Sequence, residues 1–529
     1  MSVFQESQGK GFVHLDGDNN AKFLTQETVT FLKSPENFQL VSGHAYVGAR
    51  GVKRALDLGC DIVICKSCRA YVAYLTLRLA GGRVADASPV VGAAWWWHSW
   101  SDRDYDQLAG SLVAGHLIEC SGYGSGGNFC EFFQFPLDQL VDIGFPIAEI
   151  AADGTCLITK HEGTRGFVTG DVVKSQLLYE IQGDIYLHSD SKADLSNLRI
   201  EEEGKDRVRV SGAKGLPPPP TTKAAIFYKG GWQCEYTLNA TGYATLEKFK
   251  LHEKQIRYRL SEEKELDNFD TLEFQVCGLP ETNPRSQLRS STAIRVIGQA
   301  KNRSTLLALT RAFLETLLQH YSGMHGSMDW RLLEPKPYLA YCPCLIPQAR
   351  LEEQVHVLSR DDDTVSVEKT FSPPAYEDMS PRHDYEPQQP VPLHKFGPSS
   401  LARLGDVVLA RSGDKGANLN AGFFVREPDE WDWLRSFLDK TQMIRLMDEE
   451  WKDIYRLERC ELPGIQAVHF VIYGILLRGV SSSARLDALG KGFADYIRDR
   501  WVPIPDVFLK RYADTRPQSH RTLRLTNGV

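Results

Sequence analysis

The sequence predicts an α/β protein with a mostly parallel sheet flanked by helices, followed by a smaller α+β domain that is ferredoxin-like. An amphipathic helix pattern stops at Gly59 and leads into the apolar run Asp61–Cys65, which is typical of an αβ unit in a parallel sheet. After residue 398, shorter strand and helix patterns alternate within about a hundred residues, as in a compact α+β sandwich. These two observations set the predicted fold class.

Composition limits the kind of protein this is. The 529 residues are 42% hydrophobic and 24% charged, enough for two or three domain cores. The net charge of −7 and the scattered lysines and arginines argue against a nucleic-acid partner. The 11 cysteines form no dense framework, which favours a reducing, cytoplasmic location. The first residues lack a secretory pattern and no run reaches the roughly 18 apolar residues of a membrane span, so we expect no membrane partner.

The first half of the large domain begins with about forty polar, irregular residues. From His44 onward a turn, a short helix and the buried strand Asp61–Cys65 are expected. Residues 66–81 then lengthen the short connection expected before Gly82. One interpretation is a retained intron, because Cys65–Ser67 can be encoded by a sequence containing the donor GTAAGT; the other is an apolar surface hairpin. The transcript sequence decides between them.

A longer helix is predicted from about Asp102 to Cys120, with Ser101 as its N-cap. One face carries small and apolar residues that allow close packing on a sheet. The tryptophan-rich run Trp95–Trp100 precedes it and has two interpretations: the lining of an apolar pocket for a prenyl-like chain, or part of the core.

Later patterns complete the order of elements. Residues 141–181 read as strand, turn at Asp153–Gly154, strand, loop and a helix from about Asp171. A strand is expected at 291–300 and an amphipathic helix at 302–321. The stretch 351–397 is rich in proline and charged residues and has no sustained hydrophobic periodicity, which predicts a linker. The expected organisation is a large domain at 1–350, a linker at 351–397, the α+β domain at 398–510 and a polar tail at 511–529.

The first candidate site lies at the end of the expected strand. Arg83, Asp86 and Ser88 would stand at the crevice beyond the carboxyl ends of parallel strands, where ligands of open α/β sheets bind. The arginine fork suits an oxyanion, and Asp86 would orient a reacting group. The alternative is an internal Arg83–Asp86 pair that only closes the loop.

A second candidate is the end of the predicted long helix. His116, Glu119 and Cys120 share one helical face by their spacing. Glu119 is the candidate general acid or base, Cys120 a candidate nucleophile or acid, and His116 a substrate contact. The alternative is a hydrogen-bonded structural role. Because no CxxC or HExxH pattern supplies further ligands, no metal site is predicted.

Three loops could bind substrate. In Ser121–Asn128 the glycines, with Gly126, Gly127 and Asn128 as contacts, suit an oxyanion or pantetheine loop, although the spacing is not GxGxxG. The loop after residue 159 offers Lys160 and Thr164. In the second domain Arg411, Ser412, Asp414 and Lys415 could contact phosphate, without P-loop spacing. The alternative for Ser121–Asn128 is a plain glycine turn, and the alternative for the run from Arg411 to Lys415 is a salt-bridged turn.

Several of these motifs together resemble one family. GRVADAS, LAGSLVAGHLIEC, GGNF, GFPIAEI and KHEGTRGFVTGDVVKSQLLYEI are similar to the acyclic terpene utilisation (AtuA) family, and ARSGDKGANLNAGF, LERCELPGIQAVHFVIYG and ARLDALGKGFADYI are similar to its ferredoxin-like carboxyl-terminal domain. The resemblance covers most of residues 40–345 and 400–505. Family members begin with a strand and a glycine-rich turn that have no counterpart before His44, which suggests a start codon assigned too late.

The resemblance implies a role near terpenoid acids. The family takes its name from bacterial gene clusters that degrade citronellol- and geraniol-type acids as coenzyme A thioesters, and fungal members occur near specialised-metabolite genes. We therefore expect an enzyme, of lyase, hydratase or isomerase type, acting on a branched or terpenoid-derived acid or its thioester. The alternative is a non-catalytic accessory or scaffold subunit of a carboxylase-type or biosynthetic complex. No cofactor is evident, a coenzyme A thioester is a candidate substrate, and a homo-oligomer is compatible with the sequence.

Overall fold

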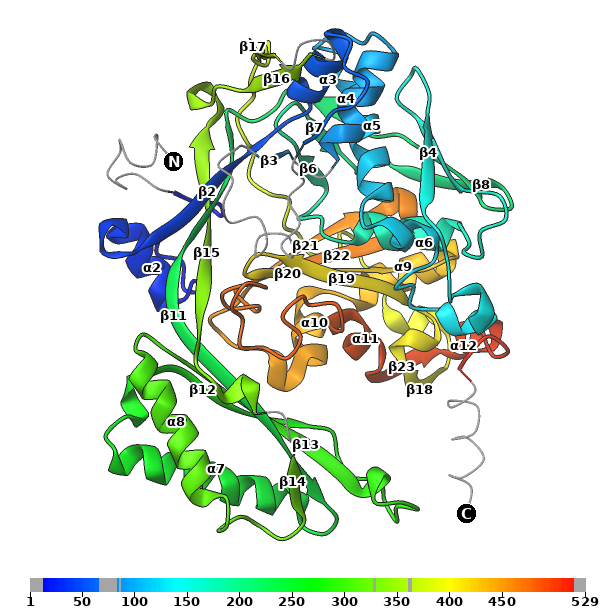
Figure 1. Cartoon of the computed structure of the whole chain (residues 1–529). Helices are drawn as coiled ribbons and strands as arrows, with labels where there is room; N and C mark the ends of the chain where they lie inside the picture. The colour runs from blue at the N-terminus through cyan, green and yellow to red at the C-terminus, as the bar shows by residue number, and fades with distance from the viewer. Residues whose placement is uncertain (1–12, 66–82, 85–86, 327–329, 360–363, 518–529) are drawn as a thin grey trace.

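The sheets of this protein are mostly antiparallel, so the prediction of a mostly parallel sheet is wrong. The computed structural model describes residues 13–65, 83–84, 87–326, 330–359 and 364–517 (Figure 1). Among the described strands only β2 (Leu40–Val47) and β3 (Arg83–Val84) pair in parallel, with Tyr46 opposite Arg83. The crevice rule that placed a site at Arg83 therefore loses its basis.

The error has a local cause. Helix α3 (Arg50–Asp57) is present as predicted, and Gly59 ends it with a left-handed φ of +81°. The apolar run that follows is not a strand, because Ile62 is 82% and Ile64 93% exposed. The sequence pattern missed β2, which lies before the helix. An apolar run shows that a segment can form a buried strand, but partner strands decide whether it does.

The large sheet is built around β11 (Thr221–Thr241), a strand of 21 residues. Its first half pairs antiparallel with β15 (Lys336–Pro347) and β2, and its second half with β13 (Ser291–Ala300). The exchange occurs at a bulge between Lys229 and Gly231, where a Cβ on Gly231 would lie 2.5 Å from the carbonyl oxygen of Ala300. The bulge bends the strand, so β11 and β15 run down one side of the molecule in Figure 1.

The remaining strands of this sheet are short or lie at its edges. They are β1 (Val13–His14), β12 (Phe269–Cys277) and β14 (Met324–Gly326). Helices α7 (Thr245–Glu262) and α8 (Arg303–Thr316) pack on its second half around Tyr236, Phe249 and Phe313 (Figure 1). Helix α2 (Gln26–Lys33) packs on the first half, where Phe31 stacks on Tyr228 at 4.2 Å between ring centroids.

A second layer holds the helices on which the predicted site depends. These are α4 (Ser88–Trp97), α5 (Tyr105–Ile118) and α6 (Gly170–Leu178). Two small antiparallel sheets flank them: β4 (Pro146–Ile150), β5 (Cys156–Lys160), β9 (Arg207–Ser211) and β8 (Arg199–Gly204) form one, and β10 (Lys214–Leu216), β7 (Lys192–Asp194) and β6 (Ile185–Leu187) the other. The predicted turn and strands at 146–160 and the helix near Asp171 are confirmed.

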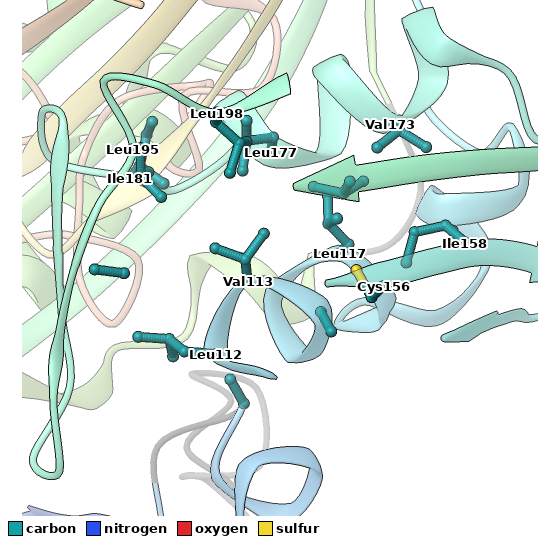
Figure 2. Close-up of a cluster of buried hydrophobic side chains, with 14 of the residues drawn as sticks. Leu112, Val113, Leu117, Cys156, Ile158, Val173, Leu177, Ile181, Leu195 and Leu198 are labelled. Carbon is teal, nitrogen blue, oxygen red and sulfur yellow. The ribbon is translucent and has the colours of Figure 1, made fainter. Parts of the chain in front are cut away.

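Helix α5 lies in the middle of this layer. Figure 2 shows Val113 and Leu117 of α5 among Ile158, Val173 and Leu177 from β5 and α6. The small residues predicted on one face of this helix are required for its close packing, because a Cβ on Gly110 would lie 2.0 Å from the carbonyl oxygen of Gly154. Helix α5 begins three residues later than predicted, with Asp104 as its N-cap.

The tryptophan-rich segment packs against this layer. Trp95 and Trp100 are buried, and their indole nitrogens donate to the carbonyl oxygens of Trp100 and Ala152, both at 2.9 Å. Trp97 is exposed. The two buried tryptophans thus serve the core, and a prenyl pocket at this segment stays a prediction.

The carboxyl-terminal domain is a four-stranded antiparallel sheet covered by helices. The strand order is β19 (Leu409–Lys415), β20 (Asn418–Phe424), β22 (Ala467–Tyr473) and β21 (Arg456–Leu462). The other elements are α9 (Pro428–Phe437), α10 (Lys440–Met447), α11 (Phe493–Arg498), α12 (Asp506–Arg511) and the pair β18 (Ser399–Arg403) and β23 (Trp501–Pro505). The α+β architecture matches the prediction.

The segment predicted as a linker lies along both domains. It contains a hairpin of β16 (Gln354–Leu358) and β17 (Val365–Lys369), followed by irregular chain. His383 Nδ1 lies 2.6 Å from Asp184 Oδ2, and the N–H of Tyr385 donates to Arg459 at 3.0 Å. The chain between the domains is therefore hydrogen-bonded to each of them.

The carboxyl-terminal domain contacts the large domain at the end of α6. Asn420 of β20 donates from Nδ2 to the carbonyl oxygen of Leu178 at 2.6 Å and accepts from the N–H of Glu180 at 3.0 Å. A Cβ on Gly422 would lie 2.8 Å from the Leu178 side chain. Such close, buried bonds fix the register of the docking. No described helix is long and apolar enough to cross a bilayer.

Candidate functional site

The glycine loop after α5 has an unusual backbone. Cys120, Ser121 and Asn128 all have left-handed φ values near +60°, as does Glu180 at the end of α6. Gly126 has φ +106°, and a Cβ there would lie 2.8 Å from the Phe167 ring. Left-handed non-glycine residues cost energy and gather where the surrounding structure holds a site in place. This backbone therefore marks the loop as a candidate site.

Strand β19 of the carboxyl-terminal domain faces this loop. Arg411 Nη1 donates to the carbonyl oxygen of Asn128 at 2.9 Å. Lys415 Nζ lies 2.6 Å from Glu180 Oε2, and Lys491 Nζ lies 2.7 Å from the hydroxyl oxygen of Tyr123. The polar groups of the two domains thus meet in one place. We call it the interdomain cluster, formed by Glu119, Cys120, Tyr123, Asn128, Tyr179, Glu180, Arg411, Asp414, Lys415 and Lys491.

Opposite charges within the cluster shift each other's pKa values. Burial would lower the pKa of Lys415, but Glu180 and Glu119 raise it overall, so Lys415 stays protonated. Burial would raise the pKa of Glu180, and the charge and hydrogen bond of Lys415 lower it overall. Lys415 and Glu180 are therefore an ion pair across the domain boundary.

Asp414 is a carboxyl group whose pKa is raised toward neutral pH. Burial, and next the negative charge of Glu180, raise its pKa to about 6, against the opposing charges of Lys415 and Lys491. A carboxyl group with a pKa near working pH can both accept and donate a proton. Tyr123 is also perturbed: burial raises its pKa, but hydrogen bonds from Lys491 and Asn128 lower it overall.

His116 is buried and holds the last turn of α5 against α6, and its role as a substrate contact stays a prediction. Its Nε2 is 3.1 Å from the carbonyl oxygens of both Gln176 and Leu177, so Nε2 carries the proton and donates. Nδ1 lies 3.2 Å from the Tyr186 hydroxyl and 3.8 Å from Glu119 Oε2. Burial lowers the pKa of His116 to about 4, so the ring is neutral.

The first predicted site is arranged differently from the expectation. Only the backbone of Arg83 is described, Asp86 lies outside the described residues, and Ser88 is fully buried at the start of α4. The N–H of Asp190 donates to His188 Nδ1 at 3.3 Å, so Nε2 of His188 carries the proton and donates to Ser88 Oγ at 2.6 Å. Ser88 accepts a bond in the core, and its contact with substrate stays a prediction.

Lys160 and Thr164 lie on the far side of the glycine loop. They line a hollow of about 810 Å³ whose floor includes the stacked rings of Phe135 and Phe167, 3.6 Å apart. The N–H of Phe167 donates to the carbonyl oxygen of Ser125 at 3.0 Å, so the hollow and the interdomain cluster share the loop. Its charged lining is mixed: Lys160, Arg165, Lys205, Asp138, Glu202 and Asp206.

The structure thus brings together some predicted residues and separates others. Glu119, Cys120, Asn128, Arg411, Asp414 and Lys415 meet, and Gly126 and Gly127 lie directly behind them. Ser412 turns away and donates to the carbonyl oxygen of Gly490 at 2.7 Å. The sequence reasoning missed Tyr123, Tyr179, Glu180 and Lys491. Glycine-flanked Lys491 carried a weak signal, but nothing in the sequence linked it to residues 121–128.

The described part of the chain holds no group of three His, Cys, Asp or Glu side chains arranged to bind a metal ion. Cys120 lies in the cluster, is partly exposed and forms no disulfide with another described residue. The chemistry available here comes from carboxyl, ammonium, guanidinium, phenol and thiol groups. Such a set can bind an anion and transfer a proton.

These features define a class of two-domain protein in which an α+β domain docks on two helix ends and shares a polar cluster with them. The model of the acyclic terpene utilisation family protein AtuA matches residues 11–357, and that of the AtuA ferredoxin-like domain matches residues 402–503. The chain belongs to the AtuA family, and its carboxyl-terminal domain is ferredoxin-like. No curated protein and no solved structure matches it. The family name points to acyclic terpene utilisation.

Proposed function

We propose that this protein is an enzyme that transfers a proton next to the carbonyl group of a branched or terpenoid-derived acid or its thioester. Such a step is common to isomerases, hydratases and lyases that act beside a carbonyl group. Asp414 is the proton-transfer group, and Glu119, at the edge of the same cluster, is the second candidate. The observation that carries the proposal is that Asp414, with its pKa raised to about 6, lies within the electrostatic influence of Lys415 and Lys491.

The division of roles follows from the charges. Lys415 is held protonated by Glu180, and it can stabilise negative charge that develops on a carbonyl oxygen. The charges of Glu180 and Lys415 both shift the pKa of Asp414, so a charge that develops beside Lys415 changes the proton affinity of Asp414. Positioned electrostatic groups in a partly dry site contribute more than the same groups in water.

The test does not require the complete reaction to be known. The full chain is incubated in D₂O with citronellate or with its coenzyme A thioester, and deuterium uptake beside the carbonyl group is followed by mass spectrometry. We expect uptake with the wild-type chain and a fall of about 100-fold or more in Asp414→Asn. Glu119→Gln tests the second candidate in the same assay.

Asp171→Asn is the matched control. Asp171 also bridges the two domains, since its Oδ2 lies 2.7 Å from Arg426 Nε, but it lies outside the interdomain cluster. This variant should exchange deuterium like the wild type. The proposal is wrong if neither ligand exchanges with the wild-type chain, or if Asp414→Asn and Glu119→Gln both exchange at the wild-type rate.

An accessory or scaffold subunit is the second candidate. It is supported by exposed apolar side chains at one end of the large sheet, where Tyr243 is 94% and Leu288 is 85% exposed. The N–H of Gly242 donates to the carbonyl oxygen of Ser290 at 3.0 Å, so these side chains belong to one region. A stoichiometric partner that co-purifies, together with no exchange activity, would favour this function.

A further inference from the structure

Arg411 is a buried charge, and at least three of its five guanidinium N–H donors have no partner among the described residues. The residue is 5% exposed. Its Nη1 donates to Asn128, whereas Nε and Nη2 are buried and have no hydrogen-bond partner among the described residues. Buried polar groups are normally paired, and an unpaired charged donor is especially costly. The unpaired edge therefore calls for an explanation.

The unpaired atoms form a geometrically specific edge. Nε and Nη2 point the same way from the planar guanidinium and make one of its two-donor forks. The rings of Tyr123 and Tyr179 lie beside the guanidinium, with their centres 4.6 and 4.4 Å from its central carbon. Because the two ring centres are only 5.8 Å apart and the rings are nearly perpendicular, they do not cover opposite faces of the guanidinium. Asn128 holds Nη1. A planar acceptor with two oxygen atoms in line with the fork would pair both unpaired donors.

We propose that the Nε/Nη2 edge of Arg411 binds a free carboxylate group of the ligand, beside the rings of Tyr123 and Tyr179. The inference rests on the proposed function and names its substrate class: a molecule that carries an ionised carboxylate, rather than a simple monoacyl thioester, whose carbonyl is neutral.

The neighbouring charges agree with this assignment. Lys491 lies 5.0 Å from the centre of the Tyr123 ring and 5.6 Å from that of Tyr179, so a second cation lies beside the same two rings. Glu180, an ionised carboxylate of the cluster, is paired with Lys415 at 2.6 Å. The pKa of Asp414 is raised to about 6, so below pH 6 this group is mostly protonated and repels an incoming carboxylate less.

The experiment compares matched ligands on the full chain. Acetate and acetamide, and then 3-methylbutanoate, its amide and its N-acetylcysteamine thioester, are titrated at constant ionic strength and followed by calorimetry. Acetate and 3-methylbutanoate should bind at least tenfold more tightly than their neutral counterparts. Arg411→Lys keeps the charge but removes the fork, and should weaken carboxylate binding tenfold or more.

Arg426→Lys is the matched control, because Arg426 also joins the domains but has its Nε paired with Asp171 at 2.7 Å. It should bind carboxylate like the wild type. If Arg411→Lys does not fold, the Nε–H signal of Arg411 in a selectively ¹⁵N-labelled wild-type chain replaces it, and this signal should shift with acetate but stay in place with acetamide.

Several results would overturn the assignment: equal binding of acid and amide, no binding of either acid, unchanged affinity in Arg411→Lys, or an unmoved Nε–H signal. The outcome is separable from that of the proposed enzyme activity. Carboxylate binding without deuterium exchange would retain this site and reject the enzyme. Exchange that depends on Asp414, without carboxylate selectivity, would do the reverse.

Discussion

The ion pair between Lys415 and Glu180 gives the most quantitative prediction. Its atoms lie 2.6 Å apart across the domain boundary, and the side chains are only 30% and 17% exposed. Glu180→Gln leaves the ammonium group without its carboxylate. Breaking a fully buried pair costs about 3–5 kcal/mol, whereas exposed pairs contribute about 0.2–1 kcal/mol. With most of both side chains covered, we expect a loss of about 2–3 kcal/mol in the free energy of unfolding.

The assay is equilibrium urea unfolding at pH 7, followed by tryptophan fluorescence and by hydrogen exchange of β19. Lys415→Met in the Glu180→Gln background removes the isolated charge and should restore about half or more of the loss, so the double-mutant cycle gives a coupling above about 1 kcal/mol. The matched control is Glu203→Gln, whose partner Arg209 lies 2.7 Å away but which is 42% exposed. That variant should change stability by less than about 1 kcal/mol.

The pH dependence follows from the directions of the two pKa shifts. The pKa of Glu180 is lowered in the folded protein, so its stabilisation is present above the ordinary value of 4.5 and is lost as the pH falls through the folded pKa. The pKa of Lys415 is raised, so its stabilisation is complete below 10.5 and is lost only at higher pH. Glu180 also helps raise the pKa of Asp414 to about 6, so the difference between wild type and Glu180→Gln should be constant only above that titration, from about pH 7 to 9. A difference below about 0.5 kcal/mol at pH 7 would refute this reasoning.

Three further predictions concern Asp414, Ser88 and Gly413. The folded pKa of Asp414, about 6, lies above its ordinary value of 3.8, so the ionised group is unfavourable in the fold; Asp414→Asn should raise the urea midpoint at pH 7.5 and leave it unchanged at pH 4. Equal effects at both pH values would contradict this. Ser88→Ala leaves the buried Nε2–H of His188 without its acceptor and should cost about 1–3 kcal/mol in urea unfolding, whereas the exposed Ser400→Ala should cost less than about 0.5 kcal/mol. A Cβ on Gly413 would lie 2.3 Å from the Tyr179 ring, so Gly413→Ala should weaken the docking of the two domains by about 1–3 kcal/mol and speed proteolysis between them. The control is Gly204→Ala, because a Cβ at Gly204 meets nothing within 4 Å. Equal cleavage of the two variants would count against the close contact at Gly413.

Local patterns predicted many elements correctly. The helix after Ala49, the strands around Asp153–Gly154 and the helix after Thr169 were all readable, because capping residues, turn residues and periodicity act within a few positions. His116 was correctly placed in the last turn of a helix, but Glu119 and Cys120 follow the end of α5, so the predicted shared helical face is wrong. The glycine loop and the run from Arg411 to Lys415 were recognised as candidates. Each of these signals depends only on neighbours in the sequence.

Only the tertiary structure decided how these pieces meet. The direction of strand pairing is invisible to periodicity, since parallel and antiparallel partners bury the same alternating face, and β11 even changes partners at one bulge. The halves of the interdomain cluster lie far apart in the chain, since Asn128 and Arg411 are 283 positions apart. The sequence by itself determined the elements, the family resemblance and the residue types available for chemistry. The docking of the ferredoxin-like domain decided which of them form a site, because burial and long-range charge pairs exist only once both domains are in place.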